Sequence, residues 1–457
     1  MSRTFIEPER ITELNDAPER DGDYVLYWMQ QSQRAVFNPA LELAVSIANR
    51  LARPVVVGFG LTDGYPEANA RHYAFMLEGL AETAQALEAR GARFVVRLGS
   101  PDEVAIALAQ RACAVVCDRG YLRVQKTWRA RVAVEAGRRV VQVEGDVVVP
   151  VELASVRHEI AARTLRPKVL KRREAFIVPL ARERLSVRAG ALALAGDVEP
   201  AALATLVSRL RVDRSVAPVS AFRGGYSQAR RQLDSFVRQR LARYVADRSK
   251  PGDPQVSAMS PYLHFGQISP VEIALAVRAA GRRDENEDSY LEELIVRREL
   301  SMNFVNTTRD YDRYTCLPPW ARRTLDAHRT DPRPHRYDED ALARAETHDP
   351  YWNAAMRELL VTGFMHNHMR MYWGKKVLEW SPTPEAGYSA LLKLNNTFFI
   401  DGRDANSYAN VGWVFGLHDR PWPERPIFGQ VRYMNAAGLE RKTDIAAYVA
   451  RTAALRP

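Results

Sequence analysis

The sequence predicts two domains, an α/β domain built on a parallel sheet and a larger domain made almost entirely of helices. Its 457 residues exceed the usual size of one hydrophobic core. Over residues 23 to 150, short apolar and β-branched runs alternate with amphipathic stretches, which is typical of a parallel sheet covered by helices. Beyond Gly224 and Gly225 the strand-like runs disappear. We therefore divide the chain into an α/β domain (1–155), a linker (156–220) and a helical domain (221–457).

Five short runs carry the strand signal of the first domain. They are Tyr24–Met29, Pro54–Phe59, Arg93–Leu98, Ala114–Cys117 and Arg139–Val143. Ala70–Arg90, between the second and third runs, is amphipathic and predicts a helix. The alternation predicts a Rossmann-like sheet with any ligand at the carboxyl ends of its strands, although no G-x-G-x-x-G dinucleotide fingerprint follows the first strand.

Three cysteines, Cys113, Cys117 and Cys316, are too few for a disulfide framework. Cys113 and Cys117 lie in one strand-like run, where a spacing of four places both thiols on one face. We expect them to be core residues rather than metal ligands, because the sequence has no further ligand nearby. His366 and His368 are two residues apart and point to different sides of a helix, so no metal site is predicted.

The predicted linker contains a strongly basic segment at residues 163 to 173. A targeting or nucleic-acid-binding signal is one interpretation of this segment. A solvated linker that lies on the other domain is the favoured interpretation.

Two serine–proline pairs predict helix starts in the second domain. Ser260 is predicted as an N-cap with Pro261 at the first helical position, and Ser269 with Pro270 repeats the pattern, with Glu272 completing a capping box. Free N–H groups at helix starts attract anions, but capping alone is sufficient to explain both pairs.

The most unusual composition lies between residues 352 and 413. Methionines and tryptophans there surround a few polar side chains that can reach the edges of one planar ring system. They are Met365, Met369, Met371, Trp352, Trp373, Trp380, Trp413, Asn367, Arg370, Asn395, Asp401, Asp404 and Asn406. This mixture favours redox or light-driven electron transfer over hydrolytic chemistry.

The spacing of the tryptophans can be examined on a predicted helix. Phe364 to Glu379 contains no proline and one glycine, and a break is expected at Gly363. Trp373 and Trp380 are seven residues apart and share a face of this helix, while Trp352 belongs to the preceding one. Indoles that approach one another suit an electron-hopping path, although on spacing alone the filling of a core is favoured.

The net charge of +10 and the pI of about 9.5 favour an anionic partner, but an arginine-rich composition alone gives the same balance. Between residues 419 and 442, basic side chains alternate with aromatic ones, as binding to an opened duplex requires. They are Arg420, Arg425, Arg432, Arg441, Lys442, Trp422, Phe428 and Tyr433. No apolar run has the length of a membrane span, and the first 30 residues lack a signal-peptide core, so we expect a cytoplasmic protein without membrane association.

Four motifs in this order resemble the photolyase/cryptochrome family. They are Ser-Pro-Tyr-Leu-His-Phe-Gly-Gln-Ile-Ser-Pro (260 to 270), Met-His-Asn-His-Met-Arg-Met-Tyr-Trp (365 to 373), Asp-Gly-Arg-Asp-Ala-Asn (401 to 406) and Phe-Gly-Gln-Val-Arg-Tyr-Met-Asn (428 to 435). Ala-Arg-Thr-Leu-Arg-Pro-Lys (162 to 168) agrees as well, so the resemblance covers nearly the whole chain. Within the family the chain is similar to the class II cyclobutane pyrimidine dimer (CPD) DNA photolyases.

The resemblance implies a carbon–carbon lyase that repairs DNA in light. Photoexcited reduced FAD would give an electron to a flipped-out CPD, whose cyclobutane bonds then split. The partner implied is DNA that contains such dimers. The protein is expected to bind it as a monomer and, in a bacterium or archaeon, to associate with the nucleoid. An antenna chromophore in the α/β domain is also implied, without an indication of its identity.

The resemblance further implies that FAD binds in a folded shape within the helical domain. The residues at the family's flavin positions are Tyr244, Ser257, Ala258, Met259, Ser260, Asn367, Arg370, Asn395, Asp401, Asp404 and Asn406. Arg370 and Asp401 would pair beside the isoalloxazine ring, and Asn395 would face its N5. A structural ion pair and a turn are the alternatives for these residues.

The substrate pocket is implied in the same way. Trp413, Met371 and Glu293 would line it, with Glu293 positioned to hydrogen-bond a base of the dimer. The family's photoreduction relay, which keeps the flavin reduced, is matched by Trp352, Trp373 and Trp380.

Arg297 departs from the pattern, because some relatives have a tryptophan there that flanks the dimer. Arginine can stack on a base or reach a phosphate. Arg248, Trp422 and Arg432 are candidates for gripping the opened strand, and ordinary surface or packing roles are the alternative.

Two other functions compete with repair. A cryptochrome-like photoreceptor would hold the same flavin without repairing DNA, but a long C-terminal extension, which would favour signalling, is not expected after Pro457. A third possible function is that of a flavoprotein or nucleic-acid-binding protein without photochemistry. Absence of flavin from the purified protein would favour this third function.

Overall fold

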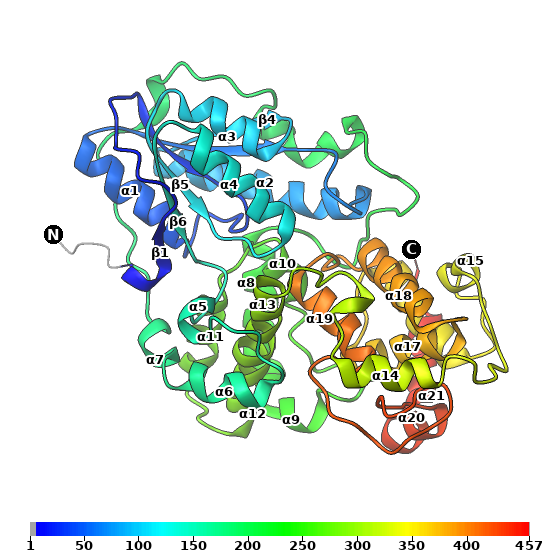
Figure 1. Cartoon of the computed structure of the whole chain (residues 1–457). Coiled ribbons are helices and arrows are strands. Elements are labelled where there is room, and N and C mark those ends of the chain that lie inside the picture. The colour runs from blue at the N-terminus through cyan, green and yellow to red at the C-terminus, as the bar shows by residue number, and fades with distance from the viewer. Residues whose placement is uncertain (1–5, 457) are drawn as a thin grey trace.

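The computed structural model describes residues 6 to 456 and divides into a sheet domain and a helical domain (Figure 1). Within the described residues the sheet has six strands in the order β1-β6-β5-β2-β3-β4. They are β1 (Ile11–Glu13), β2 (Tyr24–Trp28), β3 (Val55–Leu61), β4 (Arg93–Leu98), β5 (Ala112–Asp118) and β6 (Arg139–Val143). All five predicted strands are present. The sixth, β1, is antiparallel to β6 and escaped prediction because it is three residues long and largely exposed.

Helices cover both faces of the sheet, as predicted for an α/β domain. Helices α1 (Pro39–Leu51) and α2 (Ala70–Arg90) pack on one face, and α3 (Pro101–Ala109) and α4 (Arg123–Glu135) pack on the other. The carboxyl ends of β2 and β3 therefore lie between these helix layers.

A β-bulge in β5 changes the predicted position of the cysteines. Tyr24 pairs with Ala112 but Leu26 pairs with Val115, so β5 has one extra residue there. Cys113 consequently packs with the core under α1 and α2, and Cys117 with the opposite core. The prediction that both thiols share one face is wrong, while their burial as free thiols is confirmed.

The stretch predicted as a linker is divided between the two cores. Its first part forms α6 (Ala162–Leu170) and α7 (Arg173–Phe176), which bury Leu165, Val169 and Phe176 among the helices. A later part, including the 3-10 helix Pro200–Arg209, packs against α2. The basic segment 163–173 is therefore helical, and it packs its apolar side chains on the helical domain while its basic side chains stay partly or fully exposed.

The second domain is helical, and among the residues up to 456 no strand follows β6. Its elements begin with α5 and, in Figure 1, α5 to α7 and α11 to α13 lie to the left of α14 to α21. The bounds are α5 (Val151–Ala154), α8 (Tyr226–Gln239), α9 (Tyr244–Asp247), α10 (Ser260–His264), α11 (Pro270–Ala279), α12 (Glu285–Leu291), the π-helical turn η5 (Glu292–Arg297), α13 (Arg298–Thr307), α14 (Pro319–Ala327), α15 (Glu339–Ala343), α16 (Pro350–Thr362), α17 (Asn367–Trp380), α18 (Pro384–Phe398), α19 (Ala405–Val414), α20 (Ala436–Lys442) and α21 (Ile445–Ala453). No helix within the described range is long and apolar enough to span a bilayer.

The two serine–proline helix starts differ from each other. Ser269 caps α11 by accepting the N–H of Val271, as predicted, but Glu272 accepts instead from Tyr226 and Arg230, so the capping box is wrong. Ser260 is the first residue of α10, and Met259 occupies the N-cap position without a side-chain bond. That prediction is also wrong, because the left-handed conformation of Ala258 (φ 52°) turns the chain earlier.

Arg71 connects the two domains. It lies on α2, and its buried guanidinium donates to carbonyl oxygens at the ends of α16 and α18 and in the segment before α8. The acceptors are Ala217 (3.0 Å), Leu359 (3.2 Å), Leu360 (2.7 Å) and Phe398 (2.6 Å). The Leu359 carbonyl also accepts the backbone N–H of Gly363 (2.8 Å), so Arg71 is its second donor. The last carbonyls of a helix have few intrahelical donors, and Arg71 supplies donors to these helix ends from the other domain.

Arg71→Leu is expected to lower the free energy of unfolding by about 2–3 kcal/mol, because it removes four hydrogen bonds that a buried guanidinium makes between the two domains. Urea unfolding followed by circular dichroism measures the loss. Arg211→Leu is the control, since its side chain is 93% exposed and a change within about 0.5 kcal/mol is expected. Equal losses in the two variants would contradict the proposed role of Arg71.

Candidate functional site

A cavity of about 740 Å³ lies in the helical domain, walled by α9, α10, η5 and α13 on one side and α17, α18 and α19 on the other. Every residue predicted to hold the cofactor lines it. So do most of those predicted for the substrate, namely Arg248, Glu293, Arg297, Met371, Trp413 and Arg432. Trp352, Trp380 and Trp422 do not line it. The four motifs, far apart in the sequence, thus converge on one space.

Glu293 and Arg297 lie on η5, which interrupts the α12–α13 helix with a π-helical turn. Such turns are rare and frequent at functional sites. Glu293 forms an ion pair with Arg248 (2.7 Å), and both side chains are more than one third exposed. Arg297 is half-exposed and pairs with Glu292 (3.2 Å). The mouth of the cavity therefore carries charged side chains that can exchange partners with a ligand.

Deeper in the cavity, Arg370 and Asp401 form an ion pair (3.1 Å) in which both side chains are largely buried. The guanidinium also lies 3.7 Å from the centre of the Phe399 ring. Asn395 donates to Asn396 Oδ1 (3.1 Å), and Asn396 in turn donates to Glu67. These contacts hold Arg370 and the Asn395 amide in defined orientations on the wall.

Asp404 begins α19 by accepting the backbone N–H of Asn406 (2.8 Å). His264 Nδ1, on α10, lies 3.2 Å from its carboxylate. Burial raises the pKa of Asp404, but the His264 contact and the Asn406 bond outweigh burial and lower the pKa to about 2. His264 lies within the first motif without having been predicted as a site residue, since a lone histidine carries no spacing signal.

A second, smaller cavity of about 120 Å³ lies at the carboxyl ends of β2 and β3, where the alternating pattern predicts a ligand. His264 and Asp404 line both cavities, so this pair forms a shared wall. The Arg403 Nε and Nη2 and the side-chain amide of Gln30 are buried in the wall of the second cavity and have no hydrogen-bond partner among the described residues, although the Arg403 guanidinium lies 5.6 Å from the Tyr65 ring. Tyr65, Phe59 and other apolar side chains complete it.

The predicted tryptophans form a contiguous chain of rings. Trp373 lines the large cavity, and its ring is stacked with that of Trp352 at 6.2 Å and 15°. Trp352 meets Trp380 edge to face at 5.6 Å. The order arises because Gly363 (φ 68°) ends α16 and returns the chain as α17 beside it, as the sequence predicts. Trp352 donates its indole N–H to the Trp373 carbonyl (3.0 Å), which fixes the two helices together.

The chain of rings continues beyond Trp380 to Tyr337, whose ring centre is 5.1 Å away. Trp380 is only 2% exposed, whereas Tyr337 lies in a surface loop and is partly exposed. Tyr337 escaped prediction because it lies in an irregular segment, where no periodicity places it near the tryptophans.

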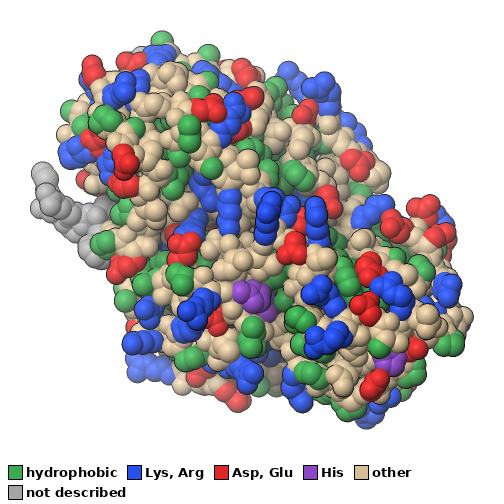
Figure 2. Space-filling view, viewed as in Figure 1, with side chains coloured by type: hydrophobic (Ala, Val, Ile, Leu, Met, Phe, Trp, Pro, Cys, Tyr) green, Lys and Arg blue, Asp and Glu red, His purple; other side chains and the backbone are tan. Residues whose placement is uncertain are grey.

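The basic and aromatic side chains after residue 418 form a network at the cavity's edge. Arg432 pairs with Asp419 (2.8 Å) and lies 4.1 Å from the Trp422 ring and 5.5 Å from the Trp413 ring. Arg420 lies on Trp422 at 4.7 Å. Among the described contacts of Trp422, the one with Arg432 connects it to the cavity wall. Figure 2 shows Lys and Arg side chains over both domains on one face, mixed with acidic ones.

Lys375, which was not predicted, is in contact with residues of the cavity wall. Its ammonium is fully buried, donates to the Val414 carbonyl and lies 4.9 Å from the Trp413 ring. Burial lowers its pKa to about 7. Lys375 therefore contacts two residues of the cavity wall, Trp413 and Val414, without lining the cavity itself.

The family model described as DNA photolyase matches residues 25–185. The chain is 47% identical over 448 residues to the deoxyribodipyrimidine photo-lyase of Methanothermobacter thermautotrophicus, covering 98% of each chain. It is 37% identical to the enzyme of that name from Potorous tridactylus, covering 93% of this chain and 80% of the relative.

Two solved structures share the fold. A bacterial class III photolyase from Agrobacterium tumefaciens superposes with a TM-score of 0.75 at 21% identity, over 96% of this chain and 88% of the other. An archaeal photolyase from Sulfolobus tokodaii, described with two FAD molecules that imply a novel light-harvesting cofactor, gives a TM-score of 0.68 at 17% identity, over 93% of this chain and 89% of the other.

Proposed function

This chain belongs to the DNA photolyase family, and we propose from that premise that it is a class II enzyme that uses light to split CPDs in DNA. The family assignment carries the coarser statement: the chain is a photolyase that acts in DNA repair with FAD as its cofactor. The finer proposal is carried by one observation. The predicted flavin and substrate residues line one cavity, from which a chain of indole rings leads away.

The large cavity fits FAD in size and in chemistry. Its volume of about 740 Å³ is in the range of cofactor sites. Met365, Trp373 and Leu391 supply apolar walls for a flat ring system, between polar groups such as Arg370 and Asn395. The buried Trp373 indole N–H and the Nε2 atom of His418 lack partners among the described residues, so the wall retains unused polar atoms.

The proposed division of the wall follows from these side chains. Tyr244 and Ser257 to Ser260 would hold the diphosphate, and Arg370, Asp401 and Asn395 would face the ring. The chemistry supplied by bound reduced FAD is light-driven transfer of one electron to the substrate. Arg370 would favour negative charge on the ring, and Asp401 holds that guanidinium in place.

The dimer is proposed to enter the same cavity from its charged mouth. Trp413 and Met371 offer surfaces on which the extruded bases pack, and Glu293 can accept a hydrogen bond from a base once it leaves Arg248. Arg297, which stands where some relatives have tryptophan, keeps a planar group for stacking and adds a charge for a phosphate.

The tryptophans are proposed to return electrons to oxidised flavin. Trp373, Trp352 and Trp380 carry electrons between the cavity and Tyr337, which is the outermost ring. This path maintains the reduced cofactor and takes no part in splitting the dimer.

The second cavity is proposed to hold an antenna chromophore. A planar, partly polar pigment suits its aromatic walls and the unpaired N–H groups of Arg403. The light-harvesting cofactor described for the Sulfolobus tokodaii photolyase supports this proposal.

The principal experiment is light-dependent repair. The reduced protein is illuminated in blue or near-ultraviolet light with a thymine-dimer oligonucleotide, and the return of thymine absorbance is compared with a dark control. We expect recovery only in light. Flavin present and dimer bound without recovery would favour the cryptochrome-like photoreceptor instead.

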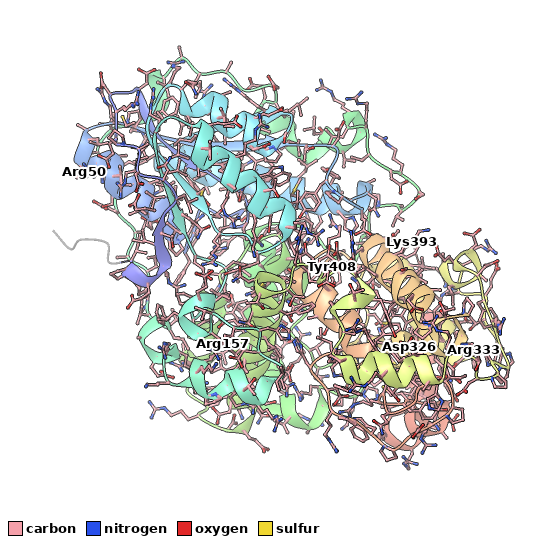
Figure 3. All side chains as sticks on the ribbon, viewed as in Figure 1. Arg50, Arg157, Asp326, Arg333, Lys393 and Tyr408 are labelled. Carbon is pink, nitrogen blue, oxygen red and sulfur yellow. The ribbon has the colours of Figure 1, made fainter. Side chains whose placement is uncertain are left out.

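Dimer binding is expected to weaken as salt rises, because phosphate contacts release counterions at about 0.9 ions each. Arg420→Gln, at the basic edge of the cavity, is expected to reduce the slope of log affinity against log salt by about 1. Fluorescence anisotropy of a labelled oligonucleotide measures it. Arg50→Gln is the matched control, since Arg50 is an exposed arginine on α1 at the outer edge of the sheet domain (Figure 3). An unchanged slope in Arg420→Gln would contradict this DNA-binding edge.

A further inference from the structure

The outer end of the ring chain carries two histidines beside Tyr337. The Tyr337 hydroxyl lies 2.6 Å from His348 Nδ1 and also accepts the backbone N–H of His348 (2.9 Å). His335 is stacked on His348 with ring centres 3.6 Å apart. The His348 ring also meets Trp380 at 5.5 Å. A phenol, an imidazole and the outermost tryptophan are thus in mutual contact at the surface.

We propose that His348 accepts the phenolic proton of Tyr337 when Tyr337 gives an electron to oxidised Trp380. This inference rests on the proposed electron path and adds a proton acceptor to it. His348 acts here as a positioned base at the end of the path, and it does not line the cavity proposed for the flavin and the dimer.

The step balances as a coupled transfer of one electron and one proton. One electron passes from the Tyr337 ring to the Trp380 radical cation, which returns to the neutral indole. The phenolic O–H bond breaks, and its proton forms an N–H bond at His348 Nδ1. The products are a neutral tyrosyl radical and an imidazolium. The oxidant is Trp380 itself, after it has passed its own electron towards Trp352.

The geometry satisfies the requirement for proton transfer. A donor–acceptor distance of 2.6 Å is within the range needed for a general base. The Nε2–H tautomer of His348 leaves the Nδ1 lone pair directed at the phenol. The second bond at the phenol oxygen, from the His348 backbone N–H, fixes the hydroxyl relative to the same residue. Because His348 is exposed, the imidazolium can release its proton to water.

The surroundings of His348 favour its neutral form. Burial of the ring and the neighbouring His335 and Lys376 lower its pKa below 6.5, against the opposing effect of Asp349 and Glu379. A base with a lowered pKa is free to accept a proton at and above pH 7 and loses this capacity as pH falls. Tyrosyl formation is therefore expected to decline on the acid side of neutrality.

Flash photolysis of the flavin-loaded protein tests the inference, with transient absorption of oxidised tryptophan and of the tyrosyl radical recorded separately. His348→Gln keeps a hydrogen-bond acceptor but removes the base, so Tyr337 oxidation is expected to slow by about 10²-fold and oxidised tryptophan to persist longer. Tyr337→Phe identifies the tyrosyl signal by abolishing it. His335→Gln is the matched control: the tyrosyl yield at pH 8 should be retained, and the pH midpoint should rise because the stacked histidine no longer lowers the His348 pKa.

The outcomes separate this inference from the path on which it rests. Tyrosyl formation at the parent rate in His348→Gln, or formation independent of pH in the parent protein, would overturn the role of His348. Oxidised tryptophan without any tyrosyl signal would overturn it as well, while leaving the tryptophan path intact. Absence of oxidised tryptophan in the parent protein would overturn both.

Discussion

Trp352→Phe is expected to abolish photoreduction of the bound flavin while leaving light-driven repair by the chemically reduced protein near the parent rate. Trp352 is the ring between Trp373 and Trp380, and no other described ring contact joins those two. It does not line the cavity, so the flavin and dimer sites remain as they are. The rate of flavin reduction under steady blue light with an external reductant measures the first effect, and the thymine-absorbance assay measures the second.

Trp320→Phe is the matched control for this substitution. Trp320 packs against the same hydrophobic core but has no ring contact with the chain of tryptophans. Both variants lose an indole of the same domain, and Trp352→Phe also loses the bond to the Trp373 carbonyl, so their flavin content and thermal midpoints should be compared first. If repair fell in parallel with photoreduction, the relay role of Trp352 would have to be abandoned.

Glu293→Ala is expected to lower the repair rate by about 10²-fold with flavin content unchanged, because a positioned polar contact to the reacting base is lost. Removing Glu293 also breaks its ion pair with Arg248, but a surface ion pair alone contributes little. The expected loss of rate is larger because Glu293 lines the cavity in which the dimer is proposed to bind. Single-turnover repair of a pre-bound dimer by reduced protein measures the loss without a contribution from binding.

Glu292→Ala is the matched control for Glu293. It lies on the same π-helical turn and carries the same charge, but it pairs with Arg166 and Arg297 and does not line the cavity. Its repair rate should stay within about threefold of the parent, the change that a surface pair of about 0.6 kcal/mol allows. Loss of flavin from Glu293→Ala would show that the carboxylate maintains the fold of the cavity rather than contacting the substrate.

The regular part of the fold could be predicted from the sequence because it depends on local patterns. Alternating apolar runs located β2 to β6, and an amphipathic stretch located α2 with its bounds. The bulge in β5 could not be predicted, since an inserted residue alters register without altering composition. The division of residues 156–220 between two hydrophobic cores could not be predicted either, because packing between domains leaves no pattern in the local sequence.

The candidate site could be predicted only through the motifs. Trp352, Trp373 and Trp380 have a helical spacing that fits a core as well as a relay, and only the fold brings their rings into sequence. His264, Tyr337 and His348 escaped prediction because their partners lie in other elements. A sequence pattern does not predict contacts between irregular segments that are distant in the chain.

The wall shared by the two cavities has a thermodynamic consequence. His264 and Asp404 contact each other and line both cavities. A ligand in one cavity that stabilises the contact between His264 and Asp404 therefore changes the binding free energy of a ligand in the other cavity. Such coupling is reciprocal: if the pigment tightens FAD binding by some factor, FAD tightens pigment binding by the same factor. Titration of FAD with and without the second ligand, and the reverse titration, should therefore give one and the same coupling free energy.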